Sequence, residues 1–367
     1  MRPFFEARHD ELAARLAGIH GFGGDDRAVA QDMGSSHGLY GYLLPEGDAP
    51  IDVRALCVIR ERLGYVSPLA DAIFAVQGLG SYPIALAGTD AQKRRWLPGL
   101  RAGSRIAGFA LTEPEAGSDV ASMQATARAD GGGYVLDGDK TLISNVGIAD
   151  QYVVFAKLPA APGDKPHRAI TAFVVESGAD GLTETPIPMG IEHPIGALAL
   201  RGCRVGADAR LGDEGRGFRL AMQTLDTFRV SVGAAAVGMA QRAFDEALAH
   251  VRARVQFGAA LGSHQLVQAQ LADMATELDA ARLLVLRAAY EKDAGRERVT
   301  VEAAMAKLYA TEAAQRIIDA AVQLHGGRGV VAGETVEALY RAIRPLRIYE
   351  GTSEIQRLII GRALVEG

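Results

Sequence analysis

Glu350 is a carboxylate whose place in the sequence could support acid–base chemistry. It lies in the string Tyr349-Glu-Gly-Thr-Ser-Glu-Ile-Gln-Arg357, directly before a predicted helix that begins at Thr352 or Ser353. A glutamate with an ordinary pKa of about 4.3 is a poor base, but an apolar site that excludes water moves the pKa toward the working pH. The string is also typical of a helix N-cap at Ser353 with a glutamine at the third helical position, which would leave Glu350 solvated. Taken alone, the string favours this second interpretation.

The run at residues 109–119, FALTEPEAGSD, could hold a cofactor. It leaves a predicted strand and enters a loop rich in hydroxyls, carboxylates and small residues. Pro114 and Gly117 fix a tight path, while Thr112, Ser118 and free backbone N–H groups could bond the polar edge and diphosphate of a flavin. Considered alone, an ordinary turn explains the run better.

Two further stretches offer groups that suit a diphosphate. Arg254 precedes Phe257-Gly258, and a guanidinium can form bidentate, charge-assisted hydrogen bonds with diphosphate oxygens. Gly326 and Gly327 would allow backbone to approach a diphosphate closely. The competing explanations are a surface arginine ahead of a helix-ending Gly258, and a glycine-rich helix C-terminus at 326–327.

Several other chemistries lack support in the sequence. The glycines around Gly21 and Gly78 neither follow a predicted strand nor complete a dinucleotide-binding fingerprint. The eight histidines show no metal-ligand spacing, and Cys57 and Cys203 form no CxxC pair, so we expect no catalytic metal and no disulfide. A formal net charge of -5 gives no field for holding nucleic acid or an anionic membrane. We also expect no signal sequence, no membrane span and a cytoplasmic location.

The hydrophobic periodicity of the 367 residues predicts the elements that must position these groups. In the first third of the chain, apolar residues recur at spacings of three and four residues, as in amphipathic helices. The middle third has β-rich runs separated by glycine turns, and the helical spacing returns in the last third. The long helical stretches are predicted at residues 218–254, 265–293 and 300–325. We therefore predict an α+β multidomain protein with an N-terminal all-α domain (1–105), a middle β-sheet domain (106–212) and a C-terminal four-helix-bundle-type domain (213–367).

In their order along the chain, these motifs resemble those of the acyl-CoA dehydrogenase family, and the resemblance covers nearly the whole sequence. The run at 109–119 is similar to the family's first signature, and Gly138-Asp-Lys-Thr-Leu-Ile-Ser-Asn145 resembles the strand that lies against the flavin ring. The stretch from Arg254 to Gln265 resembles the FAD-binding segment. Gln323-Leu-His-Gly-Gly-Arg-Gly329 is similar to a segment that reaches the nucleotide of a neighbouring subunit, and 349–357 resembles the loop that carries the base.

The resemblance implies that Glu350 removes the α-proton of an acyl thioester, with Arg229 near the active centre. Ser144 matches the hydroxyl expected to bond flavin N5, whereas Leu142 stands where the family commonly has an aromatic residue. Some members place the base at the position matched here by Phe228, which cannot take a proton. The residues implied to bind FAD are Phe109, Leu111, Thr112, Gly117, Ser118, Leu142, Ser144, Arg254, Gln256, Phe257, Gln265, Gln323, Gly326, Gly327, Thr352 and Glu354. Those implied to contact substrate are Ser118, Asp226, Arg229, Tyr349 and Gly351.

The helix after Ser67-Pro68 matches one that closes the acyl pocket in relatives, which would place Asp71, Ala72 and Ala75 near the pocket floor. Asp71 could meet a polar acyl terminus. A carboxylate early in a helix, however, more often lies on the surface and stabilises the helix dipole. The sequence therefore leaves the acyl group open.

The activity implied by the resemblance is FAD-dependent α,β-dehydrogenation of an acyl-CoA to the trans-2-enoyl-CoA, a reaction of fatty acid metabolism, with flavin N5 as the hydride acceptor. An electron-transfer flavoprotein is the implied electron acceptor, and a homotetramer or homodimer the implied assembly. Leu142 keeps an acyl-CoA oxidase or a flavin monooxygenase open as alternatives. A non-catalytic flavin- or acyl-binding protein is the alternative from another class. A thioester on a carrier protein would present the same arm as CoA.

Overall fold

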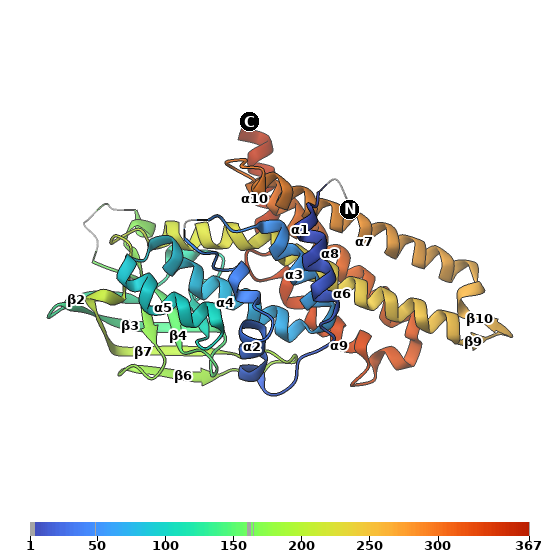
Figure 1. The fold of residues 1–367 in the computed structure, drawn as a ribbon, viewed down its shortest axis with the longest axis horizontal. Coiled ribbons are helices and arrows are strands. Elements are labelled where there is room, and N and C mark those ends of the chain that lie inside the picture. Colours follow the sequence, from blue (N-terminus) through green and yellow to red (C-terminus); the bar gives the residue numbers. More distant parts are fainter. Residues whose placement is uncertain (1–3, 48, 160–162, 164, 367) are drawn as a thin grey trace. The chain divides into compact units, whose positions relative to one another are not determined.

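The computed structural model describes residues 4–47, 49–159, 163 and 165–366 (Figure 1). Helices, then a β-sheet, then helices follow one another along the chain, which confirms the predicted α+β architecture. The chain divides into two compact units. The sheet unit comprises Phe22–Ile51 and Ala72–Phe228, and the bundle unit comprises Met1–Gly21, Asp52–Asp71 and Arg229–Gly367.

The sheet unit is built around eight strands in the order β6-β7-β3-β2-β4-β5-β8, with β1 paired in parallel to β4. Strands β4 and β5 are each buried at six successive residues, which explains why their sequences are continuous apolar runs and not alternating ones. The strands are β1 (Ala107–Ala110), β2 (Thr126–Asp130), β3 (Gly133–Ser144), β4 (Gln151–Lys157), β5 (Ile170–Glu176), β6 (Leu182–Pro186), β7 (Ile195–Gly206) and β8 (Arg210–Leu211).

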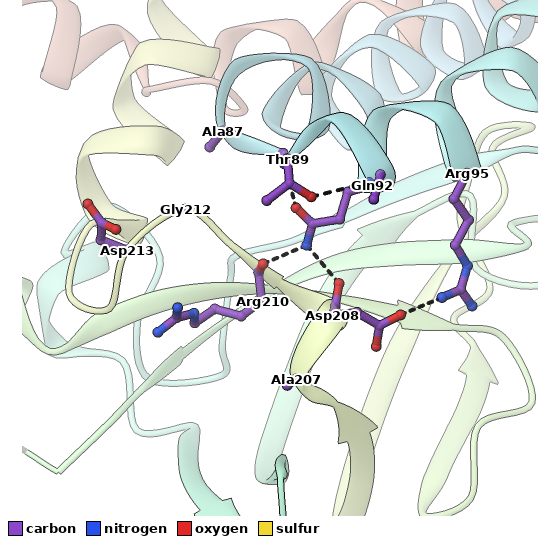
Figure 2. A pocket seen from close by; sticks show the side chains of 11 residues that line it. Ala87, Thr89, Gln92, Arg95, Ala207, Asp208, Arg210, Gly212 and Asp213 are labelled. Atoms are coloured by element: carbon purple, nitrogen blue, oxygen red, sulfur yellow. Dashed lines mark hydrogen bonds and ion pairs between the residues drawn. The ribbon is translucent and has the colours of Figure 1, made fainter.

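The sheet unit also contains helices α2 (Asp26–Ser35) and α5 (Asp90–Ala102), most of α4 (Pro68–Ala87) and the first part of α6 (Gly217–Ala253), up to Phe228. Helix α5 begins with a capping box in which Thr89 and Gln92 satisfy each other's backbone N–H groups. The Gln92 amide also donates to the carbonyls of Asp208 and Arg210, both at 2.7 Å (Figure 2). One glutamine side chain thus caps α5 and docks it on the start of β8.

Helix α4 is the one helix in the described chain that is long and apolar enough to cross a membrane. Two thirds of its apolar window (67%) is buried inside the protein, which is the pattern of a core helix. Its apolar character is therefore explained by packing.

The bundle unit consists of α1 (Ala7–Ala17), α3 (Val53–Val66), α6 (Gly217–Ala253) from Arg229 onward, α7 (Gln265–Asp293), α8 (Thr300–His325), α9 (Thr335–Ala342) and α10 (Ser353–Glu366). Helix α8 is central, because α7, α9 and α10 all pack against it. Helices α3 and α6 touch backbone to backbone: a Cβ at Gly238 would lie 2.0 Å from the carbonyl oxygen of Glu61, and one at Gly64 2.4 Å from that of Ala235. Only glycine permits this approach.

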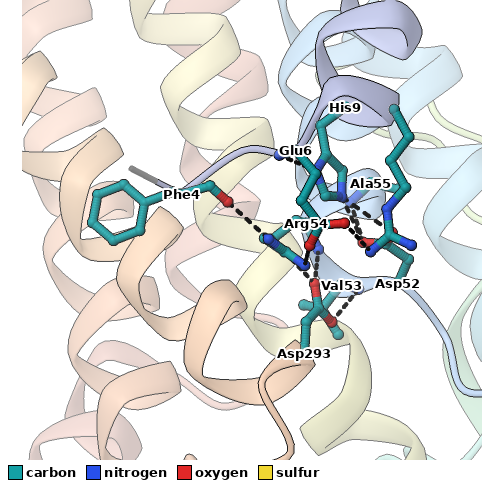
Figure 3. A network of polar contacts seen from close by, with 9 residues as sticks. Phe4, Glu6, His9, Asp52, Val53, Arg54, Ala55 and Asp293 are labelled. Atoms are coloured by element: carbon teal, nitrogen blue, oxygen red, sulfur yellow. Dashed lines mark hydrogen bonds and ion pairs between the residues drawn. The ribbon is translucent and has the colours of Figure 1, made fainter. Parts of the chain in front are cut away.

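Arg54 ties the N-terminal segment to α3 and α7 (Figure 3). Its buried guanidinium donates to Asp293 Oδ2 at 2.8 Å, to the carbonyl of Phe4 at 2.9 Å and to Glu6 Oε1 at 2.7 Å. Asp293 also accepts the N–H groups of Val53 and Arg54, while Asp52 accepts that of Ala55. The free N–H groups at the start of α3 are therefore satisfied by two carboxylates.

Candidate active site

Glu350 lies in a short loop before α10 with a backbone that non-glycine residues rarely adopt. Its φ is 52°, and Gly351 follows with a φ of 90°. The hydroxyl of Thr352 accepts the N–H of Ile355 at 3.3 Å, so α10 starts at Ser353, within the predicted pair of residues. Such strained conformations persist where surrounding contacts enforce them.

Gln356 supplies part of that enforcement. Its amide donates to the carbonyl oxygens of Gly351 at 2.9 Å and of Glu350 at 3.3 Å. It does not turn back to the N–H of Ser353, as a simple capping box would require. The interpretation of this string as only a helix cap is therefore wrong, because the Gln356 side chain binds the carbonyls of the loop and not the N–H of Ser353.

Helix α8 holds both ends of the same loop. The ammonium of Lys307 donates to the carbonyl of Gly351 at 2.8 Å. One and a half turns later, Glu312 accepts the Ser353 hydroxyl at 2.5 Å and the Nε of Arg347 at 2.9 Å. None of Lys307, Glu312 and Gln356 was among the predicted site residues, since their parts depend on helix packing and no local motif reveals them.

The surroundings of the Glu350 carboxyl group favour its protonated form. Within the described residues, its buried Oε2 has no hydrogen-bond partner. Burial raises the pKa of Glu350, and the nearby cations Arg60, Arg229 and Lys307 oppose part of that rise. A carboxylate so placed can take a proton at neutral pH more readily than an exposed one.

Arg60 and Asp71 form a buried bidentate ion pair in the bundle unit. Nε and Nη2 of Arg60 donate to the two oxygens of Asp71 at 2.9 and 2.8 Å, and Nη1 donates to Ser231 at 3.1 Å. Both charged side chains are 1% exposed. The surface interpretation of Asp71 is therefore wrong: both its oxygens are used by Arg60, whose charge acts on Tyr349 and Glu350.

The run at 109–119 is held beside the end of strand β3. The N–H of Thr141 donates to the carbonyl of Thr112 at 3.0 Å. Lys140 is fully buried and donates to Glu113 Oε1 at 2.7 Å and to the carbonyl of Leu111 at 3.2 Å. This ion pair, which the sequence reasoning missed, brings together the two motifs that were expected to face the flavin.

Leu142 is exposed at an irregular position of β3. The register between β3 and β7 shifts between Lys140 and Ile143, and Leu142 has a φ of 53°. Leu142 is 54% exposed, and a positive φ is uncommon for a residue with a bulky side chain. Two residues on, the hydroxyl of Ser144 lies 2.7 Å from Nε2 of His193, a residue that no motif indicated.

The stretch after Arg254 forms a tight hairpin between α6 and α7. Strands β9 (Val255–Gln256) and β10 (Ala259–Ala260) pair antiparallel, and Phe257 and Gly258 both have positive φ at the turn. The Phe257 ring is 95% exposed. The helix-ending interpretation of Gly258 is therefore wrong, because α6 ends at Ala253 and Gly258 closes the hairpin.

Glycines 326 and 327 begin a 3₁₀ turn after α8, where a Cβ would meet no atom within 4 Å. Open space beside these glycines is compatible with either of their two interpretations.

Phe228 is buried, with its ring edge-on to Tyr82 at 5.6 Å. Phe109 is half-buried and packs edge-on against Phe155 at 5.0 Å. Besides Leu142 and Phe257, the predicted residues that lie exposed are Gly117, Ser118, Asp226, Arg254, Gln256, Gln265, Gln323, Gly326, Gly327 and Glu354.

The predicted residues fall in both units. Those from Phe109 to Asp226 belong to the sheet unit, and those from Arg229 to Glu354 to the bundle unit. Within the described chain no cluster of potential metal ligands occurs. A surface cavity of about 520 Å³ between the start of α5 and residues 207–213 contains none of the predicted site residues (Figure 2).

Family models match almost the whole chain. The one described as "Acyl-CoA dehydrogenase, N-terminal domain" matches residues 1–104, "Acyl-CoA dehydrogenase, middle domain" matches 108–203, and "Acyl-CoA dehydrogenase, C-terminal domain" matches 215–365.

Individual proteins match over similar lengths. The human mitochondrial short-chain specific acyl-CoA dehydrogenase is 40% identical over 370 residues, covering 99% of this chain and 88% of that protein. The caffeyl-CoA reductase-Etf complex subunit CarC of Acetobacterium woodii is 36% identical, covering 91% and 89%. A crystal structure of a glutaryl-CoA dehydrogenase from Mycobacterium smegmatis in complex with FADH2 superposes with a TM-score of 0.90 at 26% identity, covering 100% and 96%.

Proposed function

Since the chain belongs to the acyl-CoA dehydrogenase family, whose members are oxidoreductases acting on CH–CH bonds, we propose that it binds FAD and converts an acyl-CoA into the trans-2-enoyl-CoA. Glu350 takes the α-proton in this proposal. The observation that carries it is the conformation of Glu350: a left-handed residue with a buried oxygen that has no hydrogen-bond partner in the described chain.

The loop geometry supports a proton acceptor at this place. Leaving a buried carboxylate oxygen without a donor costs free energy, roughly 1–3 kcal/mol or more for a charged group. Strained backbone conformations cluster at functional sites, and an unpaired buried carboxylate oxygen on such a backbone is consistent with a functional role. Phe228, which stands at the other base position of the family, is buried and cannot accept a proton.

The cations around Glu350 suit the developing negative charge. Removing an α-proton from a thioester places charge on the carbonyl oxygen, and preorganised cations and N–H donors stabilise such charge. Arg229 is buried and acts on Glu350 electrostatically. We assign Arg229 to the tuning of the base, and Ser118, Asp226, Tyr349 and Gly351, together with the N–H of Glu350, to contact with the thioester.

The residues present fit a flavin. The exposed Leu142 in its strained bulge offers an apolar surface, and the hydroxyl of Ser144, two residues further along β3, offers a polar group, as an isoalloxazine ring needs. Thr112 lies beside them through its contact with Thr141. Bound FAD would supply the hydride acceptor that no side chain can provide. The other residues assigned to FAD are Phe109, Leu111, Gly117, Ser118, Arg254, Gln256, Phe257, Gln265, Gln323, Gly326, Gly327, Thr352 and Glu354.

We propose an electron-transfer flavoprotein as electron acceptor, in view of the Etf complex named for the Acetobacterium relative. A homotetramer or homodimer in the cytoplasm, with the domain boundaries predicted from the sequence, completes the proposal. The exposed Phe257 and the open glycines at 326–327 are the features that a second subunit could cover.

The test is an anaerobic titration of the purified holoenzyme with short, medium, branched, aromatic and dicarboxylic acyl-CoAs, followed by flavin absorbance. The wild type should bleach with at least one of them, whereas Glu350→Gln should retain FAD and not bleach. Rapid bleaching of that variant would remove Glu350 from the role. Stoichiometric peroxide under air would identify an oxidase instead, and a protein without flavin or spectral response would support the non-catalytic alternative.

A further inference from the structure

We propose that Lys307 is a positioning residue for Glu350: its ammonium holds the carbonyl of Gly351, and with it the strained base loop. The inference rests on the proposed role of Glu350 as the base. It adds a residue that no motif singled out and that lies 43 positions earlier on α8.

The geometry is that of a built contact. Lys307 is fully buried, and its Nζ lies 2.8 Å from the carbonyl oxygen of Gly351. A buried ammonium is costly unless it is hydrogen-bonded. Here the acceptor is the backbone carbonyl of the residue directly after the base, so the position of the lysine ammonium is linked to the path of the loop.

The loop needs such a contact because its conformation is unfavourable. A non-glycine residue in the left-handed region is energetically unfavourable, and it persists when surrounding contacts enforce it. Lys307 and the Gln356 amide converge on the same carbonyl from two helices, at 2.8 and 2.9 Å. A carbonyl oxygen has two lone pairs, and both are used here. The direction of the peptide between Gly351 and Thr352 is thereby fixed.

Lys307 also acts on the charge of the base. The charged groups that act electrostatically on Glu350 are Arg60 from α3, Asp71 from α4, Arg229 from α6 and Lys307 from α8. Of these, Lys307 is among the cations that lower the pKa of the Glu350 carboxyl against the rise caused by burial. Removing its charge must therefore raise that pKa.

The lysine itself remains cationic at neutral pH. Burial lowers the pKa of Lys307 to about 8, and Glu350 opposes the change. The other groups that act on Lys307 are Arg229, Glu312 and Glu354. At pH 7 most molecules thus have the ammonium form that donates to Gly351.

The experiment isolates the proton step. Holoenzyme is incubated in D2O with 3-thiahexanoyl-CoA, a thioester that has an acidic α-C–H but a sulfur atom in place of the β-carbon, and α-deuterium incorporation is followed from pH 5 to 9. Lys307→Met removes donor and charge, and Lys307→Arg keeps a charge. Gln356→Leu removes the second donor to Gly351, together with the hydrogen bond to the Glu350 carbonyl, and changes no charge. Lys292→Met, at an exposed position near the end of α7, is the matched control.

Lys307→Met should keep its FAD and exchange the α-proton roughly 10²-fold more slowly, as expected for a misplaced catalytic group. The rise of its exchange rate with pH should also move to higher pH, because a cation that lowers the pKa of Glu350 has been lost. Lys307→Arg and Gln356→Leu should also exchange the α-proton slowly. In both, the exchange rate should rise at the same pH as in the wild type. Lys292→Met should behave as the wild type.

An exchange rate for Lys307→Met within about threefold of the wild type, with an unmoved pH profile, would overturn the inference. So would failure of both Lys307 variants to fold, since the lysine would then be a stability residue. A folded wild-type holoenzyme that exchanged no α-proton with any thioester would instead refute the proposed function, and this inference with it.

Discussion

The hydroxyl oxygen of Ser144 at the end of β3 lies 2.7 Å from Nε2 of His193, in the loop between β6 and β7. Ser144 is the residue proposed to bond flavin N5. A hydroxyl has one donor and two acceptor positions, so a bond to the imidazole leaves two positions for other partners. Burial lowers the pKa of His193 to about 4, so the imidazole is neutral at pH 7.

We predict that His193 makes the protein sensitive to mild acid. The pKa of a histidine in the unfolded chain is near 6.5, whereas burial holds that of folded His193 near 4. Between these values the unfolded state binds a proton that the folded state does not, so stability is present above pH 6.5 and is lost as the pH falls toward 4. The loss should be at most about 3 kcal/mol.

His193→Gln should remove this sensitivity while keeping a hydrogen bond to Ser144. Urea unfolding at pH 7 and pH 4.5 gives the comparison, with His20→Gln at an exposed position as the control. If His193→Gln lost as much stability between the two pH values as the wild type, His193 would not be the titrating group.

The sequence specified the long elements well because their periodicity is local. The helices predicted at 265–293 and 300–325 are observed with those bounds, and the one predicted at 218–254 is observed at 217–253. The order of helical, sheet and helical regions followed from the same patterns, and the family motifs identified Glu350, Ser144 and Arg229 as candidates. What these patterns record is which face of an element is buried.

The partners of the site were not predictable in the same way. Lys307, Glu312 and Gln356 look like ordinary helix residues, and only the packing of α8 and α10 shows that they hold the base loop. His193 lies in an irregular loop, about 50 residues after the serine that it contacts. Asp71 was mistaken for a surface residue, because its partner Arg60 lies 11 residues away on another helix.

The Arg60–Asp71 pair leads to a prediction of opposite sign to that for Lys307. Asp71 raises the pKa of Glu350, whereas Arg60 lowers it. Asp71→Asn should therefore move the rise of α-proton exchange with pH to lower pH. It should also cost on the order of 3 kcal/mol of stability, because the buried Arg60 loses its counterion.

The control for Asp71→Asn is the double variant Arg60→Met/Asp71→Leu, in which no buried charge is left without a partner. It should recover much of the stability. In this double variant, the rise of the exchange rate should occur at higher pH than in the wild type. The reason is that Arg60 lowers the pKa of Glu350 more than Asp71 raises it. If the exchange rate of Asp71→Asn rose at the same pH as that of the wild type, or at a higher pH, this account would be contradicted.

The contact between α3 and α6 gives a prediction that does not depend on function. A methyl group at Gly238 would lie 2.0 Å from the carbonyl oxygen of Glu61 and 2.9 Å from the N–H nitrogen of Tyr65. Both neighbours are helix backbone, so neither can move aside as a side-chain end would. Gly238→Ala should therefore lower the free energy of unfolding by about 3 kcal/mol, at the upper end of what overpacking costs.

Gly361→Ala on α10 is the matched control, because a Cβ there would meet nothing within 4 Å. An alanine in a helix interior is favoured over glycine by up to about 1 kcal/mol, so this variant should be slightly more stable than the wild type. Thermal unfolding of the two holoenzymes beside the wild type gives the measurement. Should Gly238→Ala unfold at the wild-type temperature, the two helices must be able to separate without cost, and their backbone contact would not stabilise the bundle unit.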